Sequence, residues 1–342
     1  MTLSLSIETS CDETSVAIVN EKAEILSQIT SNQVEHKAFG GVVPEIASRA
    51  HLEILQKNIP MCLKKAGLNL KNIDFFCATS GPGLIGGLLV GSITAKSIAV
   101  SLKKPFYPIN HLEGHILSPL FNNTVKFPNI TLLLTGGHTQ IYLVKNIHKY
   151  ELLGESVDDA IGESFDKVAK LIKLAYPGGP QIEKLALMGN DSEFSLPHPL
   201  NNKDEINFSF SGIKTAVSLI VKKQKKISLE FKKNLAASFQ KKIILILEKK
   251  LENVLRIIDQ KKIKIKNISI VGGVAANLEI RKTLSSNINL NKYNIIYPPV
   301  ELCGDNAAMI GLVGHYKFKN KIKPDYLFKE NPRLSINSNK NL

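Results

Sequence analysis

The chain has 342 residues, of which 44% are hydrophobic and 22% are charged. These values are ordinary for a folded globular protein, so they argue against long disordered stretches, and the length is sufficient for two domains. The formal net charge is +14. A basic surface attracts nucleic-acid phosphates. However, only four of the 44 basic residues are arginine, and Lys, Asn and Ile are all abundant. An A/T-rich genome therefore explains the charge as well as an RNA partner does.

The first residues contain no targeting segment. The apolar run at 3–7 is short and is followed at once by acidic residues, which is not the pattern of a signal peptide. The four cysteines are scattered and form no CxxC pair, which is typical of a reduced, intracellular protein. We therefore expect a cytoplasmic protein.

Two segments share one plan. Residues 3–20 and residues 129–146 each consist of an apolar run, a short polar turn and a second apolar run. This pattern predicts a β-hairpin with a polar loop at its tip.

The first hairpin is followed by a predicted buried strand at 74–79 and a helix near 86–102. Residues 83–102 are apolar over about 20 positions, close to the length of a membrane span. Their many glycines and small residues, together with Lys96, favour a buried and closely packed helix instead.

Beyond the second hairpin, residues 228–258 have apolar side chains at three- and four-residue intervals, which predicts a long amphipathic helix. Its lysine pairs at 232–233, 241–242 and 249–250 are expected on the solvent face. A strand is predicted at 267–273 and a helix near 277–286, and this alternation indicates α/β layers. The polar chain after residue 319 is expected to be a loosely held extension.

The strongest local motif is HLEGH at 111–115. On a helix, His111 and His115 lie on one face, so both rings can reach one metal ion. Asp305 stands in a turn before an apolar helix and is a candidate third ligand, although an Asp at this position also makes a good helix N-cap. Two histidines and one carboxylate suit Fe(II) or Zn and leave coordination positions open.

Glycine-rich turns form a second group of signals. They occur at 134–139, 176–180 and 271–277, and none matches the P-loop or GxGxxG pattern. Glycine lets the backbone approach a phosphate closely. Together with the acidic loop at 10–13, the three turns predict a nucleotide site between two lobes.

Several of these segments are motifs of one family. The chain contains, in order, IETSCDETSVAIV, HKAFGGVVPEIASRAH, GPGLIGGLLVG, INHLEGH, LLTGGHTQIY, GESFDKVAKLIKLAYPGGP, FSFSGIKTAV, VGGVAANLEIR and CGDNAAMIG. Over about residues 5–315 the sequence resembles the tRNA threonylcarbamoyl transferases of the TsaD family, long labelled O-sialoglycoprotein endopeptidases.

The resemblance implies an α/β, two-lobed actin-like ATPase fold with a duplicated core, in which the two hairpins are phosphate loops. It implies an N-terminal lobe over 1–125, a C-terminal lobe over 126–306, and a helix returning to the first lobe plus a tail over 307–342.

The resemblance also implies the activity: transfer of a threonylcarbamoyl group from threonylcarbamoyl-adenylate to the exocyclic amine of the adenosine 3′ of the anticodon, in tRNAs that read ANN codons. The implied cofactor is one divalent metal on His111, His115 and Asp305, with Fe(II) favoured and Zn as the alternative. The implied substrate contacts are Leu134, Thr135, Gly136, Gly137, His138, Asp166, Gly179, Glu183 and Asn277.

Two positions depart from the family pattern. Glu183 stands where many members have Asp, so its contact to the ribose is in doubt. Gly304 replaces a usual Thr beside the metal carboxylate.

The reaction is acyl transfer from a mixed anhydride with a good leaving group, so it needs no covalent nucleophile on the enzyme. The attacking amine must lose a proton, and Asp12 and Glu13 are candidates for assisting that step. Their alternative role is to hold the hairpin or to meet a basic partner. Cys11 is expected to be structural. The expected partners are tRNA, an inactive TsaB-like paralogue and a small TsaE-like P-loop ATPase, with no membrane.

Three rival functions fit these residues less well. A metalloprotease needs Glu directly after the first His or directly before the second, and Glu113 occupies neither position. A sugar or acetate kinase-like phosphotransferase binds Mg²⁺ through phosphates and carboxylates, which the two histidines argue against. A catalytically silent scaffold does not need metal ligands, so the presence of His111, His115 and Asp305 argues against this function.

Overall fold

The computed structural model describes residues 1–33 and 41–336. The start of the HKAFGGVVPEIASRAH motif and residues 337–342 of the expected tail lie outside the described residues. The chain divides into two compact units, the first comprising Met1–Asn123 and Asp305–Leu342 and the second Thr124–Gly304. Asp305 thus opens the second segment of the first unit, whereas the sequence placed a boundary after residue 306.

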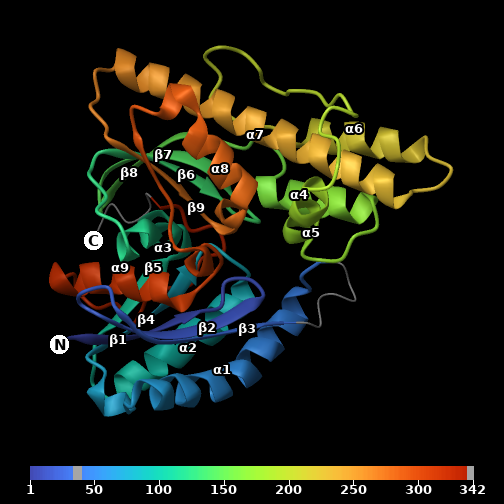
Figure 1. The fold of residues 1–342 in the computed structure, drawn as a ribbon. Helices are drawn as coiled ribbons and strands as arrows, with labels where there is room; N and C mark the ends of the chain where they lie inside the picture. Colours follow the sequence, from blue (N-terminus) through green and yellow to red (C-terminus); the bar gives the residue numbers. More distant parts are fainter. Residues whose placement is uncertain (34–40, 337–342) are drawn as a thin grey trace. The chain divides into compact units, whose positions relative to one another are not determined.

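The first unit is built on a five-stranded mixed sheet with strand order β3-β2-β1-β4-β5 (Figure 1). The hairpin strands β1 and β2 pair antiparallel, as do β2 and β3, whereas β1, β4 and β5 run parallel. The predicted first hairpin and the strand near 74–79 are thereby confirmed. The strands are β1 Leu3–Glu8, β2 Glu13–Asn20, β3 Ile25–Asn32, β4 Phe75–Gly81 and β5 Phe106–Asn110.

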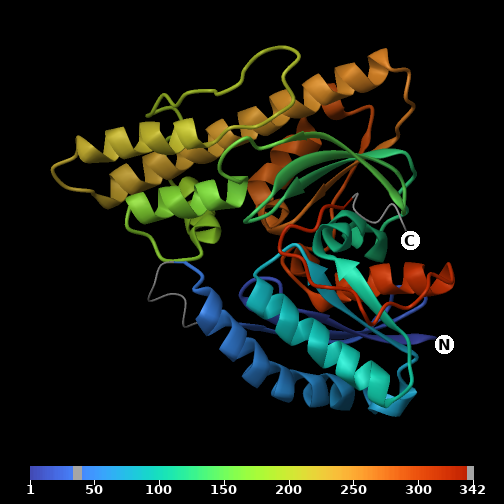
Figure 2. The same cartoon turned by 180° about the vertical axis from the view of Figure 1, so that it is seen from behind.

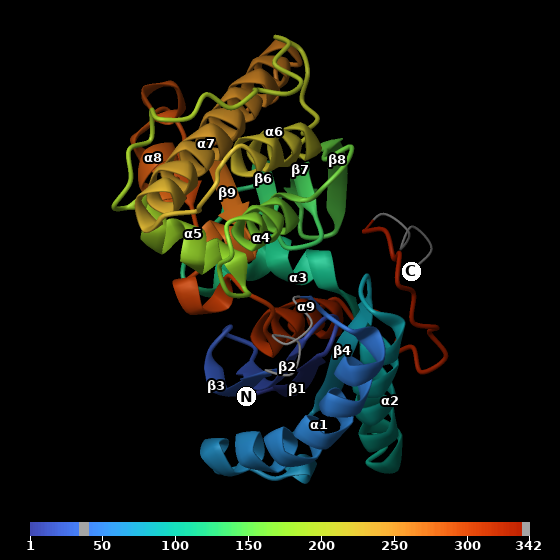
Figure 3. The ribbon, with the colours of Figure 1, turned by 90° about the vertical axis from the view of Figure 1, so that its right-hand side faces the viewer.

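Helices cover both faces of this sheet, which explains why β1 is buried at every position. The helices α1 (Pro44–Ala66) and α2 (Ile85–Ser101) lie on one face (Figure 2), and α9 (Ala307–Lys319) lies on the other (Figure 3). Small residues allow the close approach of α9, since a Cβ built on Gly311 would lie 2.9 Å from Ser6 Oγ. The short α3 (His111–Leu117) follows β5 directly.

Helix α2 packs closely on one side only. A Cβ on Gly87 would lie 2.3 Å from the Thr9 carbonyl oxygen, which confirms a tight helix–strand contact. The predicted buried helix is confirmed on this side only, because Ile85, Leu89 and Ile93 are 46%, 38% and 52% exposed. Even so, no helix in residues 1–33 and 41–336 has the length and apolar character needed to cross a membrane.

The C-terminal segment is not loosely held as far as residue 336, contrary to the expectation. Lys96 donates to Glu330 and to the Phe328 carbonyl oxygen, both at 2.6 Å. The Asn331 amide donates to the Ser80 carbonyl oxygen at 2.9 Å, and Leu334 is buried. Specific hydrogen bonds to α2 and β4 of the same unit therefore hold the segment.

The second unit repeats the same sheet plan, with order β10-β9-β6-β7-β8. The hairpin β6–β7 is antiparallel, β8 pairs antiparallel with β7, and β9 and β10 extend the sheet in parallel. Each unit thus has a three-stranded antiparallel meander joined through its first strand to two parallel strands, which confirms the duplicated core. The strands are β6 Asn129–Leu134, β7 Thr139–Asn146, β8 Lys149–Glu155, β9 Asn267–Val271 and β10 Asn294–Ile296.

The helices of the second unit are α4 Ile161–Leu171, α5 Gly178–Ala186, α6 Ser211–Lys222, α7 Leu229–Gln260 and α8 Leu278–Ser286. The long amphipathic helix is confirmed in α7, whose apolar side chains join the core formed with β6, β7 and β9. One part of that prediction is wrong. Lys250 is fully buried and donates to the carbonyl oxygens of Leu200 and Glu205 at 2.6 and 3.0 Å, so it is not on the solvent face.

Candidate functional site

Helix α3 places the two histidines of the HLEGH motif. Its N-cap is Asn110, whose side chain accepts hydrogen bonds from the amides of Leu112 and Glu113 at 2.9 and 3.3 Å. This cap starts the helix at the end of β5, so His111 and His115 are one turn apart on one face. Both are buried, with exposed fractions of 7% and 0%.

The start of α9 places the carboxylate. Asn306 is the N-cap of α9 and accepts from the Met309 amide at 3.0 Å, so the alternative that Asp305 caps this helix is wrong. Ser15 of β2 accepts from the Ala307 amide at 3.0 Å. These bonds fix the first turn of the helix and leave the Asp305 side chain available to the histidines.

Gly114 explains how α3 and α9 come close enough to share a site. A Cβ at this position would lie 2.9 Å from Met309 Cγ. The glycine between the two histidines therefore allows α3 to pack directly against α9, and this contact brings His115 next to Asp305.

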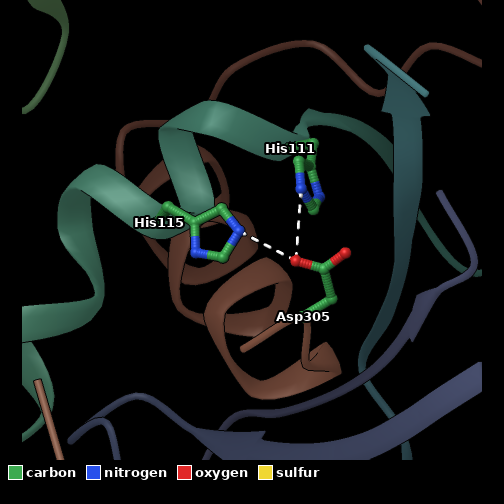
Figure 4. Close-up of side chains that lie close together, drawn as sticks. All are labelled: His111, His115 and Asp305. Atoms are coloured by element: carbon green, nitrogen blue, oxygen red, sulfur yellow. Dashed lines mark hydrogen bonds and ion pairs between the residues drawn. The ribbon is translucent and has the colours of Figure 1, made fainter. Parts of the chain in front are cut away.

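The three side chains converge (Figure 4). Asp305 Oδ1 lies 3.0 Å from His115 Nε2 and 3.5 Å from His111 Nε2, and one ligand atom from each residue lies within 4.8 Å of the others. Two ligands bound about 2.1 Å from a tetrahedral ion are roughly 3.4 Å apart, so the set has the spacing of a single metal site. This possible metal-binding triad lies wholly within the first unit.

The two histidines have different electrostatic surroundings. Burial lowers the pKa of His111, but the negative charges of Asp305 and Glu8 outweigh it and raise the pKa to about 9. Burial dominates at His115 and lowers its pKa below the ordinary value. Protons and a metal ion therefore compete for the Nε2 atom of His111.

One residue of this site was not predicted from the sequence. Glu8, the last residue of β1, is fully buried, and its Oε2 lies 3.0 Å from His111 Nδ1. The sequence signal for Glu8 is its position as an acidic residue at the end of a strand whose other residues are apolar residues and serines.

The acidic loop after β1 lies near the same carboxylate. Burial raises the pKa of Glu13 well above its ordinary value, and the charges of Asp305 and Asp12 raise it further. Burial also raises the pKa of the Cys11 thiol, with Asp12 and Asp305 adding to the effect. A thiol in such surroundings remains protonated, in agreement with a structural role.

In the second unit, the first glycine-rich turn joins β6 to β7. The Thr135 amide donates to the His138 carbonyl oxygen at 2.8 Å, and the His138 amide donates to Thr135 Oγ1 at 2.9 Å, so the turn is closed by its own polar groups. Gly136 and Gly137 are exposed at its tip, whereas Leu134 is buried at the end of β6.

The remaining predicted contacts surround this turn. A Cβ on Gly162, in the first turn of α4, would lie 2.8 Å from Gly136 Cα, so α4 begins directly against the turn. Asp166 of α4 accepts from the Gly178 amide at 2.7 Å, which holds the start of α5 and places Gly179 beside it. The structure therefore groups the first turn with Asp166 and Gly179.

Glu183 and Asn277 meet at the start of α8. Asn277 caps this helix by accepting from the Ile280 amide at 3.0 Å, and its Nδ2 donates to Gln240 at 2.8 Å. Glu183 accepts from the Leu278 amide at 2.7 Å. Both side chains thus already have structural partners. The loop that precedes Asn277 adjoins the first glycine-rich turn, because a Cβ on Gly272 would lie 2.4 Å from the Leu134 carbonyl oxygen.

Comparison with solved structures identifies the class of fold. The full-length HypF structure in its phosphate- and nucleotide-bound form has a TM-score of 0.58 at 14% identity, with 94% of this chain and 55% of that chain covered. Component A of (R)-2-hydroxyglutaryl-CoA dehydratase from Acidaminococcus fermentans has a TM-score of 0.53 at 16% identity, covering 94% of this chain and 100% of that chain. The chain therefore has the actin-like ATPase fold, as the resemblance implied.

Sequence comparison identifies the family. The family described as TsaD, tRNA N6-adenosine threonylcarbamoyltransferase, matches residues 24–312. Proteins named tRNA N6-adenosine threonylcarbamoyltransferase are 47% identical in Rickettsia rickettsii (strain Sheila Smith), over 97% of both chains, and in the Wolbachia of Brugia malayi (strain TRS), over 98% of both. The chain belongs to the tRNA N6-adenosine threonylcarbamoyltransferase family.

Proposed function

We propose that this chain forms threonylcarbamoyladenosine in tRNA. It transfers the threonylcarbamoyl group of threonylcarbamoyl-adenylate to the exocyclic amine of the adenosine 3′ of the anticodon, in tRNAs that read ANN codons. The observation that carries the proposal is the convergence of buried His111 and His115 with Asp305, in a chain 47% identical to named transferases over nearly its whole length.

One divalent metal is bound by His111, His115 and Asp305. Two imidazoles and one carboxylate form the donor set of many non-haem Fe(II) sites, so Fe(II) is favoured, and the same set also suits Zn. When bound, the metal orients the donor or acts as a Lewis acid toward its carbonyl group. His111 and His115 are buried, and the charge of a metal ion is screened less in such surroundings than in water, so its effect on the carbonyl group is larger.

The adenylate binds to the second unit through the turn Leu134–His138 together with Asp166 and Gly179. Exposed Gly136 and Gly137 present backbone amides without a side chain in the way, which suits a phosphate group. Because Glu183 and Asn277 already bond within the protein, we infer that they act mainly by holding the start of α8.

The transferred group leaves a mixed anhydride, so the leaving adenylate needs no covalent assistance from the protein. The attacking amine must lose a proton, and Asp12 and Glu13 assist that step.

The tRNA backbone binds a basic hollow on the second unit. The hollow measures about 1030 Å³ and includes four lysines with Phe127 and Tyr293. Among the described residues no ion pair neutralises these four lysines, so they are available to phosphates. They are Lys126, Lys262, Lys264 and Lys266.

The protein acts in the cytoplasm with an inactive TsaB-like paralogue and a small TsaE-like P-loop ATPase. An exposed apolar stripe on α2, formed by Ile85, Leu89, Ile93 and Val100, supports a protein partner, because exposed apolar patches mark interaction sites. The ATPase is carried over from the family resemblance alone.

The direct test combines metal analysis of the purified protein with nucleoside analysis of tRNA from a depleted strain. The proposal expects about one metal ion per chain and a loss of threonylcarbamoyladenosine on depletion. Unchanged nucleoside levels in the depleted strain would reject the function.

A further inference from the structure

Glu8 is a buried carboxylate, and both of its oxygens have hydrogen-bond partners. It ends β1 and is fully inaccessible. Its Oε1 accepts from the Ser10 amide at 2.6 Å, and its Oε2 accepts from the Thr79 hydroxyl and lies 3.0 Å from His111 Nδ1. Burying an ionised carboxylate is costly unless it is paired and hydrogen-bonded, so this arrangement calls for a compensating role.

The fold holds Glu8 rigidly. Strands β1 and β4 run parallel, with Ile7 beside Ala78, so Glu8 and Thr79 lie side by side on neighbouring strands. Oε2 is therefore held by Thr79 of β4, and Oε1 is held by the Ser10 amide in the loop that follows β1.

This contact determines which nitrogen of His111 is free. A carboxylate can only accept, so Nδ1 carries the proton that bonds to Glu8. In the neutral ring the lone pair then resides on Nε2, the atom that faces Asp305 at 3.5 Å. The negative charge also makes the ring more basic, as in the carboxylate–histidine–metal arrangements common in metalloproteins.

The second histidine has no such support. Within residues 1–33 and 41–336, His115 Nδ1 has no hydrogen-bond partner, although the ring is fully buried. His115 is held by packing and by its contact with Asp305. Of the two imidazoles, His111 is therefore the one oriented by a buried carboxylate.

We propose that Glu8 is a positioning residue of the metal centre, which fixes the tautomer and ring orientation of His111 and strengthens metal binding through it. The proposal rests on the proposed metal site, because it assigns Glu8 a role behind one of that site's ligands. Glu8 itself does not contact the metal or the substrates in this account.

The test measures metal affinity by chelator competition with Fe(II) and with Zn, using the parent protein and the variants Glu8→Ala and Glu8→Gln. Loss of a supporting carboxylate typically weakens metal binding about 10–100-fold, and we expect this for Glu8→Ala. Glu8→Gln keeps the shape and one acceptor oxygen but loses the charge, so we expect a smaller loss.

Glu330→Gln is the matched control. It removes another buried carboxylate of the same unit, one paired with Lys96 and not with a metal ligand. We expect it to reduce stability in urea while leaving the metal dissociation constant unchanged. If Glu8→Ala does not fold, the isosteric Glu8→Gln variant still reports the effect on affinity.

The outcomes separate the two proposals. A parent protein that binds neither metal would reject the metal site, and with it the role of Glu8. A parent that binds metal while both Glu8 variants bind it equally tightly would reject the role of Glu8 and leave the metal site intact. Equal weakening by Glu8→Gln and Glu330→Gln would show that the effect follows from stability, and would also overturn the assignment.

Discussion

Gly272 and Gly273 are neighbours in the loop after β9, and adding one methyl group to each should have opposite consequences. Gly272 has φ +93°, and its Cβ would lie 2.4 Å from the Leu134 carbonyl oxygen. At Gly273 a Cβ would meet nothing within 4 Å, and the same holds for Gly137 in the first turn.

The expected magnitudes follow from these contacts. An unfavourable backbone conformation costs about 1–3 kcal/mol and overpacking costs about 1–3 kcal/mol, so Gly272→Ala should lose roughly 2–6 kcal/mol of unfolding free energy. In a domain of this size each kcal/mol lowers Tm by about 2–4 °C. Gly273→Ala and Gly137→Ala should be as stable as the parent, or up to about 1 kcal/mol more stable, because alanine restricts the unfolded chain.

Urea and thermal unfolding of the three variants measure the stability effect, and binding of a non-hydrolysable adenylate analogue measures the site. If the donor approaches the backbone at these turns, Gly137→Ala and Gly273→Ala should bind the analogue at least tenfold more weakly, about 1.4 kcal/mol, while remaining fully folded. A Gly272→Ala protein as stable as the parent would refute the packing argument. Unchanged analogue affinity in Gly137→Ala and Gly273→Ala would show that the turns are merely structural.

The other predictions concern the metal, the C-terminal segment and the RNA surface. The double variant of His111 and His115 to Ala should lose bound metal and transfer activity while keeping its helical circular dichroism; full metal content would reject the ligand set. Burial raises the pKa of Glu330, but its bond to Lys96, together with contributions from Ser92 and the backbone, outweighs this and holds the pKa below the ordinary 4.5. The pair therefore stabilises the fold above pH 4.5, and this contribution disappears as the pH falls through the lower folded pKa. In urea unfolding, Glu330→Gln should cost about 1.5–3 kcal/mol at pH 7 and much less near pH 3, and an equal cost at both values would contradict the assignment. Glutamine at three lysines of the basic hollow should weaken tRNA binding and make the slope of log K against log salt shallower by up to about 3. A control with three exposed lysines of α1 replaced should change the slope less, and equal effects would favour a purely compositional charge. The hollow variant carries Lys262, Lys264 and Lys266 to Gln, and the control carries Lys57, Lys64 and Lys65 to Gln.

Local patterns in the sequence predicted local structure well. The two hairpins and α7 follow from residue periodicity alone, since the alternation of apolar and polar side chains is a property of neighbouring residues. The i and i+4 spacing of His111 and His115 likewise follows from helix geometry once the segment is helical. The apolar residues of α7 have the spacing of one helix face, so the sequence predicts that these side chains face the core.

Features that depend on distant parts of the chain could not be predicted in this way. The contact of Glu8 with His111 joins residues 103 positions apart, and no local pattern encodes it. Lys250 resembles its exposed lysine neighbours in sequence, but its ammonium group donates hydrogen bonds to carbonyl oxygens of residues about 50 positions earlier. The polar composition of the C-terminal segment predicts a loosely held extension, whereas polar groups of this segment bond to β4 and α2.

The most direct test of the central claim is in vitro transfer. The purified chain, loaded with Fe(II) and supplied with threonylcarbamoyl-adenylate and its expected protein partners, is incubated with an unmodified tRNA that reads an ANN codon, and the digested nucleosides are measured by mass spectrometry. We expect threonylcarbamoyladenosine to form at the adenosine 3′ of the anticodon, and no product from a tRNA with another base at that position. A complete mixture that leaves this adenosine unmodified while the chain cleaves a glycoprotein would contradict the transferase function and support the protease alternative.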